Sequence, residues 1–115
     1  MNLSKMKCIP CKVGGAPLSR DEIKKYRDLL GAGSGWKVLF DKPKAGRLLH
    51  SYEFDDFAAA MKFVNKVAAL AEKNGHHPNI RMYSWNKLEL EFFTHKIGGL
   101  SEADFVLAAK IDTLL

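Results

Sequence analysis

Two pairs of short alternating segments, each pair followed by a helix with a clear start signal, constrain the fold of this chain most strongly. Large apolar and polar residues alternate along residues 36–40, 47–54 and 87–94, which is the two-residue period of a strand with one buried face. A turn over residues 41–46 joins the first two segments, so we expect an antiparallel hairpin there. A third strand near residues 82–85 precedes the strand at 87–94 and completes the second pair.

The first and last helices are marked by matching start signals. Ser19 with Glu22, and Ser101 with Asp104, have the three-residue spacing of a capping box, in which side chains and backbone N–H groups satisfy each other in both directions. Gly31 is the first of three glycines that end the first helix. The last helix has apolar residues at helical spacing that we expect to face the core: Leu107, Ile111 and Leu114.

The middle helix is the longest of the three. Asp55 or Asp56 caps its start, it runs to about Asn74, and Gly75 fits the position just after its last turn. Its wide apolar stripe is typical of a helix that lies on a sheet. We assign six residues to this stripe: Phe57, Met61, Val64, Val67, Ala68 and Ala71.

The order of elements is therefore helix-strand-strand-helix-strand-strand-helix. Paired strands with helices between the pairs predict an α+β fold, in which a four-stranded antiparallel sheet has its helices packed on one face. With 115 residues the chain is long enough to form one core. Prolines and glycines deny regular structure to residues 1–17, so we expect a flexible N-terminal arm ahead of a single domain at residues 18–115.

The charge of the chain is unevenly distributed. Residues 1–50 hold 11 basic and four acidic side chains, whereas residues 51–115 hold seven basic and nine acidic ones. The basic residues form no consecutive run and do not alternate with aromatic residues, so we interpret them as a solvated face and expect no nucleic-acid partner. No apolar stretch approaches the roughly 20 residues of a membrane span, and the N-terminus lacks the apolar core of a secretory signal. We expect a cytoplasmic protein with no membrane partner.

The two cysteines, Cys8 and Cys11, have a C-x-x-C spacing within the basic arm. This is half of a four-ligand zinc site, and no second pair follows. We interpret them as free thiols. A metal completed by a partner chain or by a nearby histidine is the alternative.

Three of the four histidines fall in positions that expose reactive side chains. His76 and His77 directly follow the middle helix, and His95 ends the last strand. Histidine titrates near neutrality, so one imidazole can donate a proton while another accepts one, and Glu72 lies one helical turn before His76. Two other interpretations stay open. One is an imidazolium that only meets the helix dipole, and the other is a zinc site, which needs a sharp turn at Pro78 to aim adjacent histidines at one point.

The spacing of these residues resembles the active-site signature of the pterin-4a-carbinolamine dehydratases. The resemblance covers about residues 36–115, and the arm is similar to that of some microbial and plant-like members. Its elements, in order along the chain, are Glu72, His76-His77-Pro78, Trp85, Thr94-His95, Gly98-Gly99-Leu100 and Asp104.

The resemblance implies a hydro-lyase that eliminates water from 4a-hydroxytetrahydropterin to give quinonoid dihydropterin, in the recycling of tetrahydrobiopterin, with no cofactor and no metal. It implies three catalytic histidines, of which His76 and His95 transfer protons and His77 holds the pterin. A general acid and a general base beside a flat heterocycle suit this elimination, which protonates the leaving hydroxyl and removes the proton of ring nitrogen N5. The implied substrate-binding residues are Glu72, Trp85, Trp36, Asp104 and Pro78.

The chain departs from the animal members of that family at Gly75, Ile97 and Ala103, where they carry an acidic residue, a cysteine and an arginine. A non-enzymatic protein-binding module, of the dimerisation cofactor or transcriptional coactivator type, is the alternative function. We expect a homodimer or a homotetramer, since a four-stranded sheet leaves edges that a second copy can cover.

Overall fold

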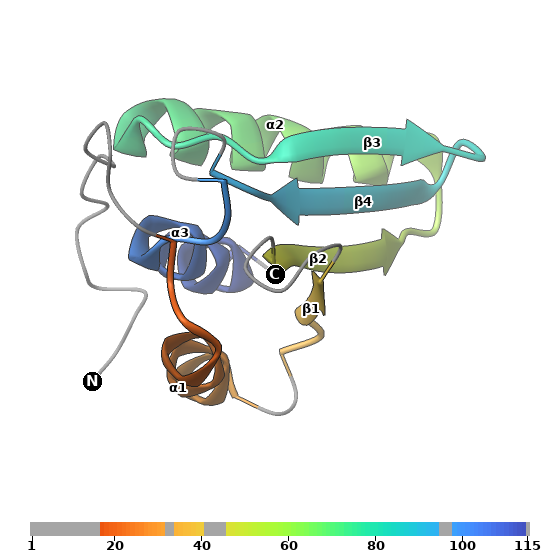
Figure 1. Ribbon diagram of the computed structural model, residues 1–115. Helices are drawn as coiled ribbons and strands as arrows, with labels where there is room; N and C mark the ends of the chain where they lie inside the picture. The colour runs from red at the N-terminus through yellow and green to blue at the C-terminus, as the bar shows by residue number, and fades with distance from the viewer. Residues whose placement is uncertain (1–16, 32–33, 41–45, 95–97, 115) are drawn as a thin grey trace.

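The computed structural model describes residues 17–31, 34–40, 46–94 and 98–114 (Figure 1). These residues form helices and strands in the predicted order. The elements are α1 (Arg20–Leu30), β1 (Lys37–Phe40), β2 (Gly46–Glu53), α2 (Phe57–Asn74), β3 (Asn79–Tyr83), β4 (Lys87–Phe92) and α3 (Glu102–Asp112). Two predicted segments lie outside the described residues, apart from the last residue of each: the N-terminal arm and the turn between the first two strands.

The strands form one antiparallel sheet in the order β1-β2-β4-β3 (Figure 1). The pairing of β2 with β4 sets Leu48 opposite Phe92, and both side chains are fully buried on the face that the helices cover. Burying each of these side chains contributes about 1.5–3 kcal/mol. The opposite face is polar and includes an ion pair between Arg47 and Glu91, with 3.1 Å between Nη1 and Oε1. The predicted α+β fold with its helices on one face is therefore confirmed.

Helix α2 lies against the sheet through a face that differs from the predicted stripe. Asp56 is its N-cap and accepts the Ala59 N–H at 2.7 Å. Phe57 is 55 % exposed and Ala68 is also exposed, so both are wrongly placed in the predicted stripe. Because this helix is apolar on more than one side, periodicity alone does not decide which side meets the sheet. The residues that the helix buries are Ala60, Phe63, Val67 and Ala71.

The third strand begins and ends earlier than predicted. It spans Asn79–Tyr83, and Trp85 lies in the turn that follows. Ser84 and Trp85 have φ values of 48° and 56°, the left-handed region that tight hairpin turns use. The side chain of Asn86 anchors this turn by donating to the Phe54 carbonyl at 3.0 Å. Ser84 and Trp85, which the alternating pattern assigned to the strand, therefore belong to the turn.

Helices α1 and α3 pack against each other on the covered face of the sheet. The predicted capping box of α1 is present, since Ser19 N–H donates to Glu22 at 3.0 Å and Glu22 N–H donates to Ser19 at 3.2 Å. Tyr26 stacks on Phe105 with ring centroids 5.6 Å apart and donates its hydroxyl proton to Glu102 at 2.5 Å. Helix α3 is buried on nearly all sides, through Ala103, Asp104, Phe105, Val106, Leu107, Ala108 and Ile111. No helix within the described ranges is both long enough and apolar enough to cross a membrane.

Candidate active site

The chain leaves α2 through a left-handed glycine, which sets the direction of the histidine pair. Gly75 has φ 65° and ψ 26°, and the His76 N–H donates to the Ala71 carbonyl at 3.2 Å in the pattern that closes a helix C-terminus. The chain then passes through His77 and the buried Pro78 into β3. Glycine adopts this backbone conformation without strain, so Gly75 sets the direction in which the chain leaves α2 and enters the histidine pair.

His76 points into the molecule. Its Nε2 lies 2.5 Å from Oδ1 of Asp104 on α3, and its ring lies parallel to that of Phe92 on β4, with centroids 5.9 Å apart. The side chain of His76 is 16 % exposed, and that of Asp104 is 0 % exposed. A carboxylate removed from water needs hydrogen-bond donors, and bonds to an ionised group are stronger than neutral ones.

Donors on the far side of Asp104 define which nitrogen of His76 carries a proton. Asp104 Oδ2 accepts the Ser101 backbone N–H and the Thr94 hydroxyl, each at 2.8 Å, and lies 3.3 Å from the Ser101 hydroxyl. Because these donors hold the group as an acceptor, Oδ1 accepts a proton from Nε2–H of His76. Nδ1 is then the nitrogen of His76 that can take up or release a proton.

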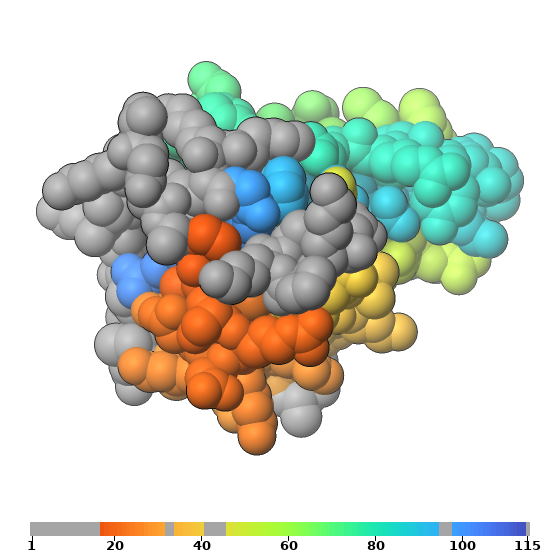
Figure 2. All heavy atoms as spheres, in the orientation of Figure 1, coloured from red at the N-terminus to blue at the C-terminus, as the bar shows by residue number. Residues whose placement is uncertain are grey.

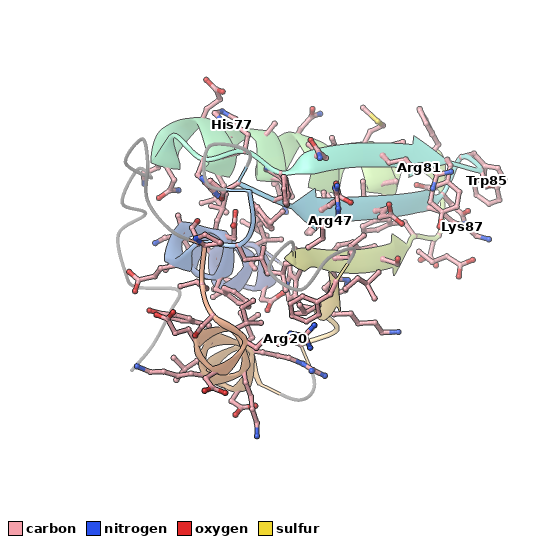
Figure 3. All side chains as sticks on the ribbon, viewed as in Figure 1. Arg20, Arg47, His77, Arg81, Trp85 and Lys87 are labelled. Atoms are coloured by element: carbon pink, nitrogen blue, oxygen red, sulfur yellow. The ribbon has the colours of Figure 1, made fainter. Side chains whose placement is uncertain are left out.

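His77 points the other way, toward the outside of the molecule at the end of α2 (Figure 3). Its Nε2 lies 2.7 Å from Oε1 of Glu72, and these side chains are 57 % and 78 % exposed. A polar contact this exposed contributes little to stability. The adjacent histidines therefore have different partners: Asp104 meets the buried one and Glu72 meets the exposed one.

The structure does not bring every predicted site residue to this place. Trp85 is 61 % exposed, and Figure 3 shows it at the opposite end of the sheet from His77. The five residues of β3 separate the two positions, which corresponds to at least about 16 Å of extended chain. His95 lies outside the described residues.

A second polar cluster surrounds Trp36, which is 4 % exposed. Its Nε1–H donates to Asp112 Oδ1 at 2.9 Å, and its ring packs on Phe92 with centroids 5.6 Å apart. Burial raises the pKa of the Asp112 carboxyl group, and burial together with the charge of Asp112 raises the pKa of the Tyr52 phenol. Trp36 is linked to His76 through Phe92, whose ring packs against both.

Sequence reasoning missed two residues that shape this site. Phe92 is only one residue of the alternating segment 87–94, and Thr94 enters the motif only as the neighbour of His95. The Thr94 hydroxyl reaches a carboxylate ten residues along the chain, so only its position just before a motif histidine could have indicated a role. The described residues contain no group of three or more His, Cys, Asp or Glu side chains placed to hold a metal ion. Cys8 and Cys11 lie outside those ranges.

Fold and site together define a small α+β protein whose buried histidine–aspartate pair is suited to proton transfer. The family described as Pterin 4 alpha carbinolamine dehydratase matches residues 16–114. A protein of Alkaliphilus metalliredigens (strain QYMF) named "Putative pterin-4-alpha-carbinolamine dehydratase" is 48 % identical over 111 residues, which cover 96 % of this chain and 94 % of that protein. "Pterin-4-alpha-carbinolamine dehydratase 2, mitochondrial" of Arabidopsis thaliana is 37 % identical over 113 residues, which cover 98 % of this chain and 59 % of that protein.

Two solved structures share the fold. The transcriptional coactivator/pterin dehydratase from Brucella melitensis has a TM-score of 0.72 and 26 % identity, over 85 % of this chain and 97 % of that one. A pterin dehydratase-like protein described as a RuBisCO assembly factor in the alpha-carboxysome has a TM-score of 0.57 and 26 % identity, over 70 % of this chain and 88 % of that one. The chain belongs to the pterin-4a-carbinolamine dehydratase family, and the resemblance in its motif is confirmed. The names of its relatives support the expectation of a hydro-lyase.

Proposed function

We propose that this chain eliminates water from 4a-hydroxytetrahydropterin and releases quinonoid dihydropterin. The observation that carries the proposal is the contact between His76 and Asp104, in which a fully buried carboxylate orients an imidazole with one nitrogen left for proton transfer. Ser101 and Thr94 hold that carboxylate from its other side. Family membership supports the substrate class.

The elimination needs two proton movements and no redox step. The C4a–O bond breaks as the hydroxyl oxygen takes up a proton and leaves as water. The N5–H proton is removed, and its electron pair forms the N5–C4a double bond, so one proton is taken up and one is released. We assign these transfers to His76, acting through Nδ1, and to His95. A positioned acid or base of this kind contributes about 10²–10⁴-fold to the rate.

His77 and Glu72 form the outer part of the proposed site. Their contact holds the His77 imidazole at the exposed rim of the site, where we place one edge of the bound pterin. The Glu72 carboxylate has further acceptor capacity for the amine and amide N–H groups at the pterin edge. Trp36 reaches His76 only through the ring of Phe92, and the buried Pro78 follows His77 in the chain. Trp85 lies at the other end of β3, away from His77 of the same chain.

The test of this assignment is a stopped-flow assay of 4a-hydroxytetrahydropterin dehydration. The double variant His76→Ala and His95→Ala should keep its fold and lose the catalysed rate. The control variant His50→Gln, on β2, should keep the wild-type rate. Wild-type turnover in the double variant would show that the proton-transfer assignment is wrong. A chelator should leave the rate unchanged, and a chelator-sensitive rate would favour the zinc interpretation instead.

A protein-binding module is the second candidate function, because the names of two structural neighbours include a coactivator and an assembly factor. Titration with a reduced pterin distinguishes the candidates. Saturable binding supports the dehydratase, and no binding up to millimolar concentrations would favour the module.

We also propose that the protein is cytoplasmic and forms a homodimer or homotetramer. In the sheet order of the described residues, β1 and β3 are the outer strands, and the outer edge of β3 is the one that we propose pairs with a second copy. Light scattering of the purified chain measures the particle mass directly. A monomer at micromolar concentration would contradict the proposed assembly.

A further inference from the structure

The basic charge of the first 50 residues is concentrated, in part, along one side of α1. Arg20, Lys24 and Arg27 are separated by four and three residues, which places them on the same face of the helix. All three line a hollow between α1 and β1, and Figure 3 shows Arg20 on the side of α1 toward that strand. None of these three side chains belongs to the proposed pterin site.

The hollow combines an apolar floor with cationic walls. Its volume is about 230 Å³, and Ile23, Val38 and Phe40 supply the apolar part of its lining. A second hollow of about 550 Å³ shares Lys24 and Arg27 and continues toward Trp36 and Gly31. Asp28 is the one acidic side chain in the two linings, so the described part of this groove favours an anionic ligand.

Strand β1 forms the other wall of the groove. It is the first strand in the sheet order and pairs with β2, so its opposite edge lies at the margin of the sheet among the described residues (Figure 1). Figure 2 shows α1, in orange, beside the yellow segment that holds β1. An exposed strand edge can hydrogen-bond to an added extended segment. The guanidinium group of Arg20 lies over the Phe40 ring, 4.4 Å from its centroid, which holds a cation at this edge.

We propose that the groove between α1 and β1 binds an extended acidic segment of a partner protein. The segment adds to the edge of β1, and its alternate side chains point to opposite faces of the sheet. Acidic side chains on one face meet the three cations of α1, while apolar side chains on the other face lie beside Leu39, which is 55 % exposed. Apolar side chains thus alternate with acidic ones.

The spacing of the cations suits such a segment. From Arg20 to Lys24 and from Lys24 to Arg27 the helix rises about 6 Å and about 4.5 Å. Alternate side chains on one face of a strand are about 6.8 Å apart, within reach of flexible lysine and arginine side chains. The open face of the adjoining sheet carries charges of both signs, with Glu89 and Glu91 beside Arg47 and Arg81, so it adds no attraction for a long polyanion such as a nucleic-acid duplex.

The probe is a fluorescein-labelled peptide, acetyl-Val-Glu-Val-Glu-Val-amide, with a control peptide in which glutamine replaces both glutamates. Lys24→Glu and Arg27→Glu should each weaken binding by about tenfold or more. Lys25→Glu is the matched control, since Lys25 is on the same helix, lies over the Tyr26 ring and does not line the groove. Binding should also slow hydrogen exchange at the backbone amides of β1, and all variants should keep the wild-type dehydration rate.

Three results would overturn the proposal. Equal binding of the glutamine peptide would exclude charge recognition. An equal loss in Lys25→Glu would show that the net charge of the chain, and not the groove, attracts the peptide. Duplex DNA that binds more tightly than the peptide and loses binding in the Lys24→Glu and Arg27→Glu variants would identify the groove as a nucleic-acid site. Because dehydration is measured on the same variants, failure of this proposal is distinguishable from failure of the proposed function.

Discussion

Replacing Asp104 by asparagine should leave the fold intact and reverse the proton positions on His76. Ser101 N–H and Thr94 Oγ–H both point at Oδ2, so the asparagine oxygen must occupy that side to accept them. The amide NH₂ group then faces His76 Nε2 at the position where Oδ1 now accepts a proton. Two donors cannot bond to each other, so Nε2 becomes the acceptor and the proton moves to Nδ1. The nitrogen required for proton transfer is then blocked.

The magnitude follows from replacing the hydrogen bond to a charged carboxylate by a bond to a neutral amide. A hydrogen bond to a charged group contributes about 1.5–3 kcal/mol, which corresponds to roughly a 10- to 150-fold decrease in kcat if the bond acts on the reacting imidazole. The free energy of unfolding should fall by a similar amount, which a domain with about 5–15 kcal/mol of stability tolerates. We expect KM to change little, because Asp104 is fully buried and cannot touch the pterin directly.

The assay is stopped-flow dehydration together with the ¹⁵N NMR signals of His76, which distinguish the two tautomers. Glu102→Gln is the matched control, because it removes one carboxylate from the first turn of the same helix and weakens the bond that Tyr26 donates, but touches no histidine. It should keep the wild-type kcat. An Asp104→Asn protein with wild-type kcat, or with unchanged His76 tautomer, would refute this reasoning.

Buried or strained groups elsewhere give three more expected outcomes. Tyr52→Phe should raise the free energy of unfolding by up to about 1 kcal/mol in a denaturant titration, because the buried hydroxyl has no partner among the described residues; a decrease would show that it is bonded. Gly75→Ala should lower the same quantity by about 1 kcal/mol, because alanine is strained at φ 65° even though its Cβ would meet nothing within 4 Å; an unchanged value would show that the helix end relaxes. The hydrogen bond to Glu102 raises the pKa of Tyr26 from 10.0 to about 12, so its stabilising effect is complete below pH 10 and is lost as the pH rises to about 12. The Tm values of wild type and Glu102→Gln should therefore converge across that window, and a constant difference would contradict the assignment.

Local signals in the sequence were sufficient to predict most elements. The capping box of Ser19 and Glu22 marks the start of α1, and Gly75 marks the end of α2, because each acts through bonds to residues a few positions away. The alternation along residues 47–54 and 87–94 predicts one buried face for each strand, and Leu48 and Phe92 lie on that face. The predicted position of the third strand was too late in the chain. Its alternating segment continues into a turn, in which Ser84 and Trp85 have positive φ values.

The predicted site depended more on packing than on spacing. The motif named His76, His77 and Asp104 together, yet it could not show that one histidine is buried against Asp104 and the other lies exposed against Glu72. The direction of each ring depends on how Gly75 turns the chain at the end of α2. Trp85 was predicted beside the histidines, although the length of β3 carries it to the other end of the sheet.

The sequence by itself determined the order of elements, the capped helix starts and the residue types available for acid–base chemistry, because these depend on interactions within a few residues. Only the tertiary structure decided which side of α2 meets the sheet, which histidine is oriented for proton transfer and where the charge of α1 is presented. His76 and Asp104 are 28 residues apart, and their contact exists because α3 packs against α2, whose C-terminal end leads into His76. A contact between the end of α2 and the start of α3 depends on how these helices pack in the core, which no local pattern specifies.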